Sequence, residues 1–161
     1  MGMAISLQAF FESHPLHYSV VSHEYAESSQ RSAAAAHRTG YKVAKSILLR
    51  DREGYLLAVL PACHRLHLQQ LNQGLGRNLT LASEDELVAR FGDCAVGAIP
   101  PAGALYDLDT IVDEALLEQE DIYFEAGDHE QLIHMNRADF SKLLGDAERG
   151  CFSVPGGQAI E

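Results

Sequence analysis

Apolar residues dominate two neighbouring stretches of the chain, residues 43–50 and 55–60. The segment that joins them, Asp51-Arg52-Glu53-Gly54, is short and polar and ends in glycine, which accepts the backbone conformations of tight turns. We therefore predict an antiparallel hairpin whose second strand ends at Pro61. Shorter apolar runs predict further strands at residues 17–24, 110–112, 122–125 and 132–135.

Helical spacing of apolar residues, together with capping residues, predicts helices between the strands. Ser83 followed three residues later by Glu86 is a capping box. Ser6 and Asn136 are further candidate N-caps. The predicted helices cover residues 6–14, 28–40, 66–75, 83–91 and 136–144. Because strands and helices follow one another in mixed order, the pattern favours an α+β (mixed α/β) fold over a regular parallel winding.

The end of the chain differs from the rest. Residues 146–161 include Pro155-Gly156-Gly157 and have little apolar content, so we predict a flexible C-terminal tail behind one domain of residues 1–145. A length of 161 residues and a hydrophobic fraction of 47% agree with a single globular domain. No apolar run approaches the ~20 residues that span a bilayer, and no signal peptide is recognisable. We expect a cytoplasmic protein with no membrane partner.

The formal net charge of −11 at first argues against a nucleic-acid partner. The charge is, however, divided unevenly along the chain. Residues 1–80 contain eight Lys and Arg against five Asp and Glu (8 − 5 = +3), whereas the remainder contains four against eighteen (4 − 18 = −14). Most of the basic residues of the first half lie between Arg31 and Arg52. An anion can therefore be bound locally in this region despite the overall charge.

Lys45 lies on an otherwise aliphatic face of a predicted strand. Because side chains alternate along a strand, Lys45 shares its face with Val43 and Leu49, while Ser46 belongs to the other face. An ammonium group is almost never fully buried without a partner. Either the stem of Lys45 extends to an edge of the sheet, or its charge meets a fixed anion or ligand. In the second case it can donate to an ester oxygen or a phosphate.

The segment Gly97-Ala98-Ile99-Pro100-Pro101-Ala102-Gly103 cannot form a regular helix or a central strand. One interpretation is a rigid connection between strands. The other is a ligand-binding loop, in which the glycines allow close approach and backbone amides such as those of Ala98 and Ile99 act as donors.

Histidine and cysteine positions do not predict a metal site or a cofactor. His64 and His67 are three residues apart, as are His14 and His17, but neither pair brings an obvious third ligand at a suitable spacing. The three cysteines are far apart and form no CxxC motif, so we interpret them as reduced thiols.

Several of these features together resemble the YbaK/prolyl-tRNA-synthetase-associated editing domain family. The resemblance covers roughly residues 4–145 and keeps the order and spacing of the family's motifs. It is carried by the Lys45 strand, the strand at residues 55–61, the helix at residues 83–91, the G-x-x-x-P-x-G pattern from Gly97 to Gly103, and residues 122–140. It implies a mixed, largely antiparallel sheet with surrounding helices, and the activity of an aminoacyl-tRNA deacylase.

The resemblance also implies roles for particular residues. Lys45 matches the functionally essential lysine of the family, and the loop with Gly97, Pro100, Pro101 and Gly103 matches the segment that lines the pocket for the aminoacyl end. His129 lies in the turn 127–130, where family members vary in the residues that face the substrate amino acid. It is either a pocket residue or a solvent-exposed turn histidine.

The implied mechanism uses few acid and base groups of the protein. A free ribose hydroxyl of the terminal adenosine helps to activate a water molecule, while Lys45 and loop amides hold the ester and its developing oxyanion. Expected partners are the aminoacyl-tRNA acceptor end and an aminoacyl-tRNA synthetase, and the oligomeric state is left open. Two alternatives are a non-catalytic module that binds tRNA ends or a synthetase, and a hydrolase of another small aminoacyl ester or thioester.

Overall fold

The computed structural model describes residues 2–24, 40–95 and 98–156. The helix predicted at residues 28–40 lies almost wholly outside these residues, and Gly97 also lies outside them.

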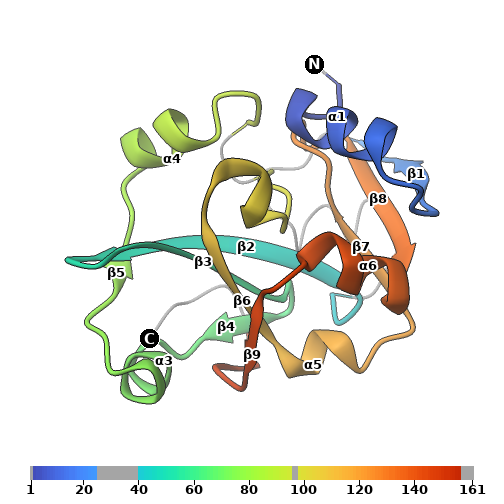
Figure 1. Ribbon diagram of the computed structural model, residues 1–161. Helices are drawn as coiled ribbons and strands as arrows, with labels where there is room; N and C mark the ends of the chain where they lie inside the picture. The colour runs from blue at the N-terminus through green and yellow to red at the C-terminus, as the bar shows by residue number, and fades with distance from the viewer. Residues whose placement is uncertain (1, 25–39, 96–97, 157–161) are drawn as a thin grey trace.

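A mixed sheet of eight strands forms the centre of the described part of the chain (Figure 1). The main path runs β1-β8-β7-β2-β3-β6-β9, and β5 pairs with β2 beside this path. Four of its strand pairs are antiparallel, and the pairs β2–β7, β3–β6 and β6–β9 are parallel. The strands are β1 (Ser19–Ser22), β2 (Val43–Asp51), β3 (Gly54–Pro61), β5 (Thr80–Leu81), β6 (Asp109–Asp113), β7 (Asp121–Glu125), β8 (Gln131–Asn136) and β9 (Glu148–Gly150). The prediction of an α+β fold with a largely antiparallel, mixed sheet is confirmed.

The predicted hairpin is present as β2 and β3, in a register that places Asp51 opposite Gly54. The carboxylate of Asp51 accepts hydrogen bonds from the backbone amides of Glu53 (2.8 Å) and Gly54 (3.2 Å). Gly54 has a φ of 131°, which explains why glycine ends this turn. Arg77 binds the same carboxylate at 2.6 Å and holds the pKa of Asp51 well below its usual range.

Helices flank the sheet on both faces. The described α-helices are α1 (Ile5–Ser13), α3 (Leu68–Leu75), α4 (Glu84–Arg90), α5 (Glu114–Leu117) and α6 (Arg137–Leu144), and a 3₁₀ turn, η1, covers Gly103–Tyr106. The capping box of α4 is confirmed, because Ser83 Oγ accepts from the Glu86 amide and Glu86 Oε1 accepts from the Ser83 amide. The predicted N-cap of α1 is wrong: α1 begins after Ala4, and the amide of Ser6 donates to Asp93.

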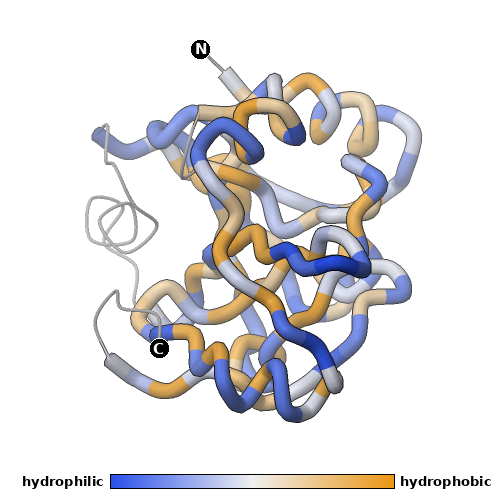
Figure 2. Tube along the Cα trace, turned by 90° about the vertical axis from the view of Figure 1, so that its left-hand side faces the viewer, coloured by the Kyte–Doolittle hydropathy of each residue, from blue (hydrophilic) through white to orange (hydrophobic). Residues whose placement is uncertain are grey.

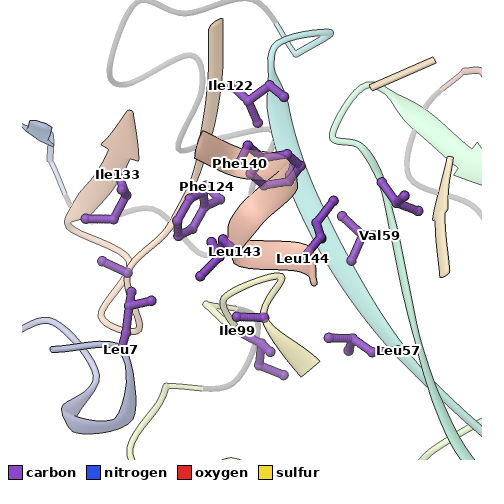
Figure 3. Packing of buried hydrophobic residues seen from close by; sticks show 14 of the residues in the cluster. Leu7, Leu57, Val59, Ile99, Ile122, Phe124, Ile133, Phe140, Leu143 and Leu144 are labelled. Carbon is purple, nitrogen blue, oxygen red and sulfur yellow. The ribbon is translucent and has the colours of Figure 1, made fainter. Parts of the chain in front are cut away.

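Two apolar layers form on the two faces of the sheet. The larger layer is built around Ala44 and Leu48 of β2 and receives residues from α1, α5, α6 and the loop before η1. Figure 3 shows Phe124, Phe140 and Ile99 within it. The other layer is built around Leu49 and Leu60 and is covered by α3 and by the second, two-stranded sheet. Figure 2 shows hydrophobic and hydrophilic stretches alternating along the trace. The helices of the described residues include none long and apolar enough to cross a membrane.

The prediction of a flexible tail from Asp146 onwards is wrong for the residues that the structure describes. β9 pairs in parallel with β6, and β10 (Ser153–Pro155) pairs antiparallel with β4 (His64–Leu66). Phe152, between them, is 1% exposed and belongs to the α3 layer. One buried aromatic side chain and two short ladders hold this segment although its overall apolar content is low.

Candidate active site around Lys45

Lys45 lies in the middle of the sheet, on the strand face that the sequence predicts. Its neighbours on that face, Val43 and Leu49, are both 0% exposed, and Lys45 itself is partly buried. Its Nζ donates a hydrogen bond to the backbone carbonyl of His64. Among the described residues, the partner that the structure gives the ammonium is therefore a backbone carbonyl of β4.

Burial dominates the electrostatics around Lys45. It lowers the pKa of the Lys45 ammonium from its ordinary value of 10.5, and the nearby Cys63 thiolate opposes this shift. Burial likewise raises the pKa of the Cys63 thiol, and it lowers the pKa of His64. Because water is scarce here, an interaction between the ammonium and a developing negative charge is stronger than it is at an open surface.

The edge of β2 is interrupted beside Lys45. β7 pairs with β2 only at Val43 and Ala44, and β5 pairs with β2 only at Leu49 and Arg50. Within the described residues, no strand covers positions 45–48 between these two ladders. A long central strand thus has a gap in one of its ladders at the position of Lys45, although the carbonyl of Leu48 within it accepts the amide of Ala82 at 3.0 Å.

The glycine and proline loop is buried over the whole of its described part, residues 98–103. Ile99 and Ala102 belong to the apolar layer of Ala44 and Leu48, on the face of β2 opposite to that of Lys45. The amide of Ala98 donates to the carbonyl of Ala95 at 3.0 Å. The prediction that this amide is available to a ligand is therefore wrong in this structure, because a local turn already uses it.

Gly103 has a packing role that its motif does not reveal. A Cβ at this position would lie 2.1 Å from Thr110 Oγ1 and 2.9 Å from the carbonyl oxygen of Leu108. The Gly103 carbonyl also accepts the amide of Leu108 at 2.9 Å. Only glycine allows the start of η1 to lie this close to the loop that leads into β6.

Hydrogen bonds of an aspartate side chain stabilise the turn at residues 126–130, which follows β7. Asp128 Oδ1 accepts from the amides of Glu130 and Gln131, both at 3.0 Å. His129, at the tip, has a φ of 62° and is 2% exposed. A solvent-exposed turn histidine is thereby excluded, and the role of His129 as a pocket residue stays a prediction.

The turn and the loop lie together, as the resemblance implies. The amide of Ala95, which leads into the loop, donates to the carbonyl of Gly127 at 2.8 Å. On the other side, Ala4 packs against Gly127 and donates to the carbonyl of Ala126 at 2.7 Å. The turn follows β7 directly, and β7 ends beside Lys45. The loop and the turn thus lie together, and the turn follows the strand that ends beside Lys45, while Ile99 and Ala102 of the loop pack on the opposite face of β2.

Two residues that lie near Lys45, Glu125 and His64, were not identified as site residues from the sequence. Ala44 is paired with Phe124, so the next residues, Lys45 and Glu125, belong to the same face of the sheet. Glu125 is 1% exposed. The one feature of the sequence that could have indicated it is the position of an acidic residue at the end of an apolar strand. His64 holds Lys45 through its backbone carbonyl, a contact for which side-chain identity gives no signal.

Comparisons with known proteins agree with this architecture. A solved structure from Marinobacter aquaeolei VT8, described as a "putative signal transduction protein", is 25% identical with a TM-score of 0.74; the alignment covers 93% of this chain but only 30% of that one. A "putative trans-editing enzyme for prolyl tRNA synthetase" is 22% identical with a TM-score of 0.81, over 92% of this chain and 95% of that one. No curated protein matches. The model of the aminoacyl-tRNA editing domain matches residues 23–143, three quarters of the chain, and the protein therefore belongs to the aminoacyl-tRNA editing domain family.

Proposed function

We propose that this protein is a trans-acting aminoacyl-tRNA deacylase that removes a small, wrong amino acid from a mischarged tRNA, either tRNA for proline or a related one. The observation that carries the proposal is a partly buried lysine beside an interrupted strand ladder, in a chain of the editing domain family. The family membership supports an editing role, and the lysine supplies a positive charge in a partly buried position.

In the proposed reaction a water oxygen attacks the carbonyl carbon of the aminoacyl ester. The free ribose hydroxyl of the terminal adenosine relays a proton: it accepts one from the attacking water and passes its own to the ribose ester oxygen as the bond between that oxygen and the carbonyl carbon breaks. The products are the free amino acid and a tRNA with both terminal ribose hydroxyls restored. The protein positions the ester and stabilises the oxyanion.

Lys45 is the residue proposed to stabilise the oxyanion. To do so its ammonium keeps or exchanges its contact with the carbonyl of His64 while it donates to the ester oxygen, which an ammonium with three N–H bonds allows. Ser46 follows it but belongs to the opposite strand face, with Ala44 and Leu48, so we propose no covalent intermediate on this serine.

The loop and the turn are proposed to form the walls of the site. Ile99, Pro100 and Pro101 are buried, and we propose that they define the shape of this wall. His129 is proposed to contact the substrate amino acid from the turn. A buried turn that carries Asp128 and His129 favours a small amino acid whose ammonium group meets acidic surroundings.

A panel of mischarged tRNAs tests the proposal. Each tRNA carries one radiolabelled amino acid, with alanine, cysteine and serine included, and the loss of the label is followed over time with the wild-type protein and with Lys45→Ala. The proposal expects hydrolysis of at least one small aminoacyl ester that depends on Lys45. Absence of Lys45-dependent hydrolysis across the whole panel would contradict it.

The same panel separates the two alternatives. Binding of tRNA that survives Lys45→Ala, with no turnover by the wild-type protein, would indicate a non-catalytic module for tRNA ends or synthetases. Equal rates on full aminoacyl-tRNA and on a minimal aminoacyl-adenosine would indicate a general hydrolase of small aminoacyl esters. A clear preference for the full tRNA supports the proposed editing function.

A further inference from the structure

A chain of hydrogen bonds lies behind Lys45 and links it to the C-terminal segment. The carboxylate of Asp113, at the end of β6, accepts from Ser153 Oγ at 2.8 Å. Ser153 Oγ lies 2.9 Å from Nδ1 of His64, and the backbone carbonyl of His64 accepts from Lys45. Asp113 is 2% and His64 is 4% exposed, so these contacts are shielded from water.

The donor and acceptor in each of these hydrogen bonds follow from the chemistry of Asp113. An ionised carboxylate can only accept, so the hydroxyl proton of Ser153 is directed at Asp113. The lone pairs of Ser153 Oγ then face Nδ1 of His64, which must donate. His64 therefore carries its proton on Nδ1, and in the neutral ring Nε2 is the unprotonated nitrogen.

Further contacts fix the same carboxylate. Asp113 Oδ2 also accepts the amide of Phe152 at 2.9 Å, and Asp113 Oδ1 accepts the amide of Ala115, at the start of α5, at 2.9 Å. Asp113 is thus a fixed anchor that cannot rotate away from Ser153 without loss of other hydrogen bonds.

The backbone around His64 is held by the same C-terminal segment. β10 pairs with β4 in a register that sets Pro155 opposite His64. The amide of Gly156 donates to the carbonyl of Cys63 at 3.1 Å, and the amide of His67 donates to the carbonyl of Phe152 at 2.7 Å. The His64 carbonyl that holds Lys45 is therefore positioned from both sides by residues 152–156.

We propose that Asp113, Ser153 and His64 are positioning residues for Lys45, and that the C-terminal strand β10 is thereby part of the candidate site. Ser153 lies beyond residues 23–143, which the family model matches, so the editing-domain match does not include this contribution. The inference rests on the proposed function for its effect on rate, but not for its effect on the structure around Lys45.

Electrostatics agree with this arrangement. Burial lowers the pKa of His64, the charge of Lys45 lowers it further, and Asp113 opposes both. A neutral His64 with its proton on Nδ1 fulfils the hydrogen bond to Ser153 without placing a second positive charge beside Lys45.

The experiment compares the wild-type protein with three variants in steady-state deacylation, which gives kcat and KM separately. Ser153→Ala removes the link between Asp113 and His64, and Ser153→Thr restores a hydroxyl at the same place. Ser13→Ala is the matched control, because it makes the same chemical change and removes a side-chain hydrogen bond, to the carbonyl of Ala9, at an exposed residue at the end of α1. Since one hydrogen bond is lost and it acts on the transition state through Lys45, we expect Ser153→Ala to lower kcat about five- to tenfold at unchanged KM. Ser153→Thr and Ser13→Ala should stay within about twofold of the wild type.

A nuclear magnetic resonance measurement on the full chain gives an independent readout. The ¹⁵N shifts of His64 should report the Nδ1–H tautomer in the wild type and its loss in Ser153→Ala. An Nε2–H tautomer in the wild type, or an unchanged kcat in a folded Ser153→Ala, would overturn the proposal. If the wild type hydrolyses no aminoacyl-tRNA, the proposed function fails. The NMR data then test by themselves whether Ser153 positions Lys45. A Lys45 ¹³Cε signal that moves in Ser153→Ala but not in Ser13→Ala then supports the proposal, and one that does not move overturns it.

Discussion

Replacing Gly103 with alanine should destabilise the fold through a collision that the structure locates to two atoms. The added Cβ would lie 2.1 Å from Thr110 Oγ1 and 2.9 Å from the carbonyl oxygen of Leu108. The Thr110 side chain can rotate, but the carbonyl of Leu108 is backbone and is tied to Gly103 by a hydrogen bond. Forced overpacking of this kind costs about 2 kcal/mol, which for a domain of this size lowers Tm by about 4–8 °C.

The assay is urea denaturation followed by circular dichroism, with Gly74→Ala as a matched control. Gly74 lies inside α3, and a Cβ there meets nothing within 4 Å, so the same chemical change should stabilise the protein by about 0.5–1 kcal/mol. The double variant Gly103→Ala/Thr110→Ala removes one colliding atom, and its cost should fall short of the sum of the single costs by about 1 kcal/mol. A Gly103→Ala protein with the wild-type urea midpoint would refute the packing role and would favour a ligand-binding role for Gly103.

Three other predictions address the C-terminal segment, the α4 cap and the RNA partner. Phe152→Ala should destabilise the protein by about 3–5 kcal/mol, because it empties a buried site, and a loss below about 1 kcal/mol in urea denaturation would favour the flexible tail instead. Glu86 has its pKa lowered to about 2, chiefly by the hydroxyl of Tyr55, so its stabilising contribution is present above pH 4.5 and is lost as the pH falls towards 2. Urea midpoints measured across this pH range should therefore fall less in Tyr55→Phe than in the wild type, and parallel curves would argue against this role. Uncharged tRNA should bind weakly, and its affinity should fall as the salt concentration rises, because the acidic second half of the chain repels the RNA phosphates. Tight binding at physiological salt would contradict this.

The sequence predicted those parts of the fold whose signals are local. The β2–β3 hairpin is marked by Asp51 and Gly54, and α4 by Ser83 and Glu86, because each feature is decided by residues a few positions apart. β4 and β10 are three residues each and pair across almost ninety residues of chain, so nothing in either segment alone indicates a strand. Phe152 looks like an isolated aromatic residue in a polar segment until the tertiary structure provides its apolar layer.

The same distinction applies to the site. The position of Lys45 on an aliphatic strand face follows from the alternation of side chains along β2. Its partner does not, because the acceptor is a backbone carbonyl nineteen residues away. That carbonyl belongs to β4, which pairs with β10 near the other end of the chain. The loop was recognisable from its glycines and prolines, but the use of the Ala98 amide and the packing of Gly103 depend on neighbours that sequence spacing does not show.

The central claim is that the ammonium of Lys45 stabilises the transition state of ester hydrolysis. Its most direct test is the single-turnover rate of Lys45→Met on the aminoacyl-tRNA that the wild type hydrolyses fastest. Lys142→Met, whose side chain is 68% exposed on α6, serves as the matched control. The loss of a positioned donor to an oxyanion should lower the rate of Lys45→Met about 10²- to 10³-fold and leave Lys142→Met at the wild-type rate. A folded Lys45→Met protein that retains hydrolysis within about threefold of the wild type would contradict the account.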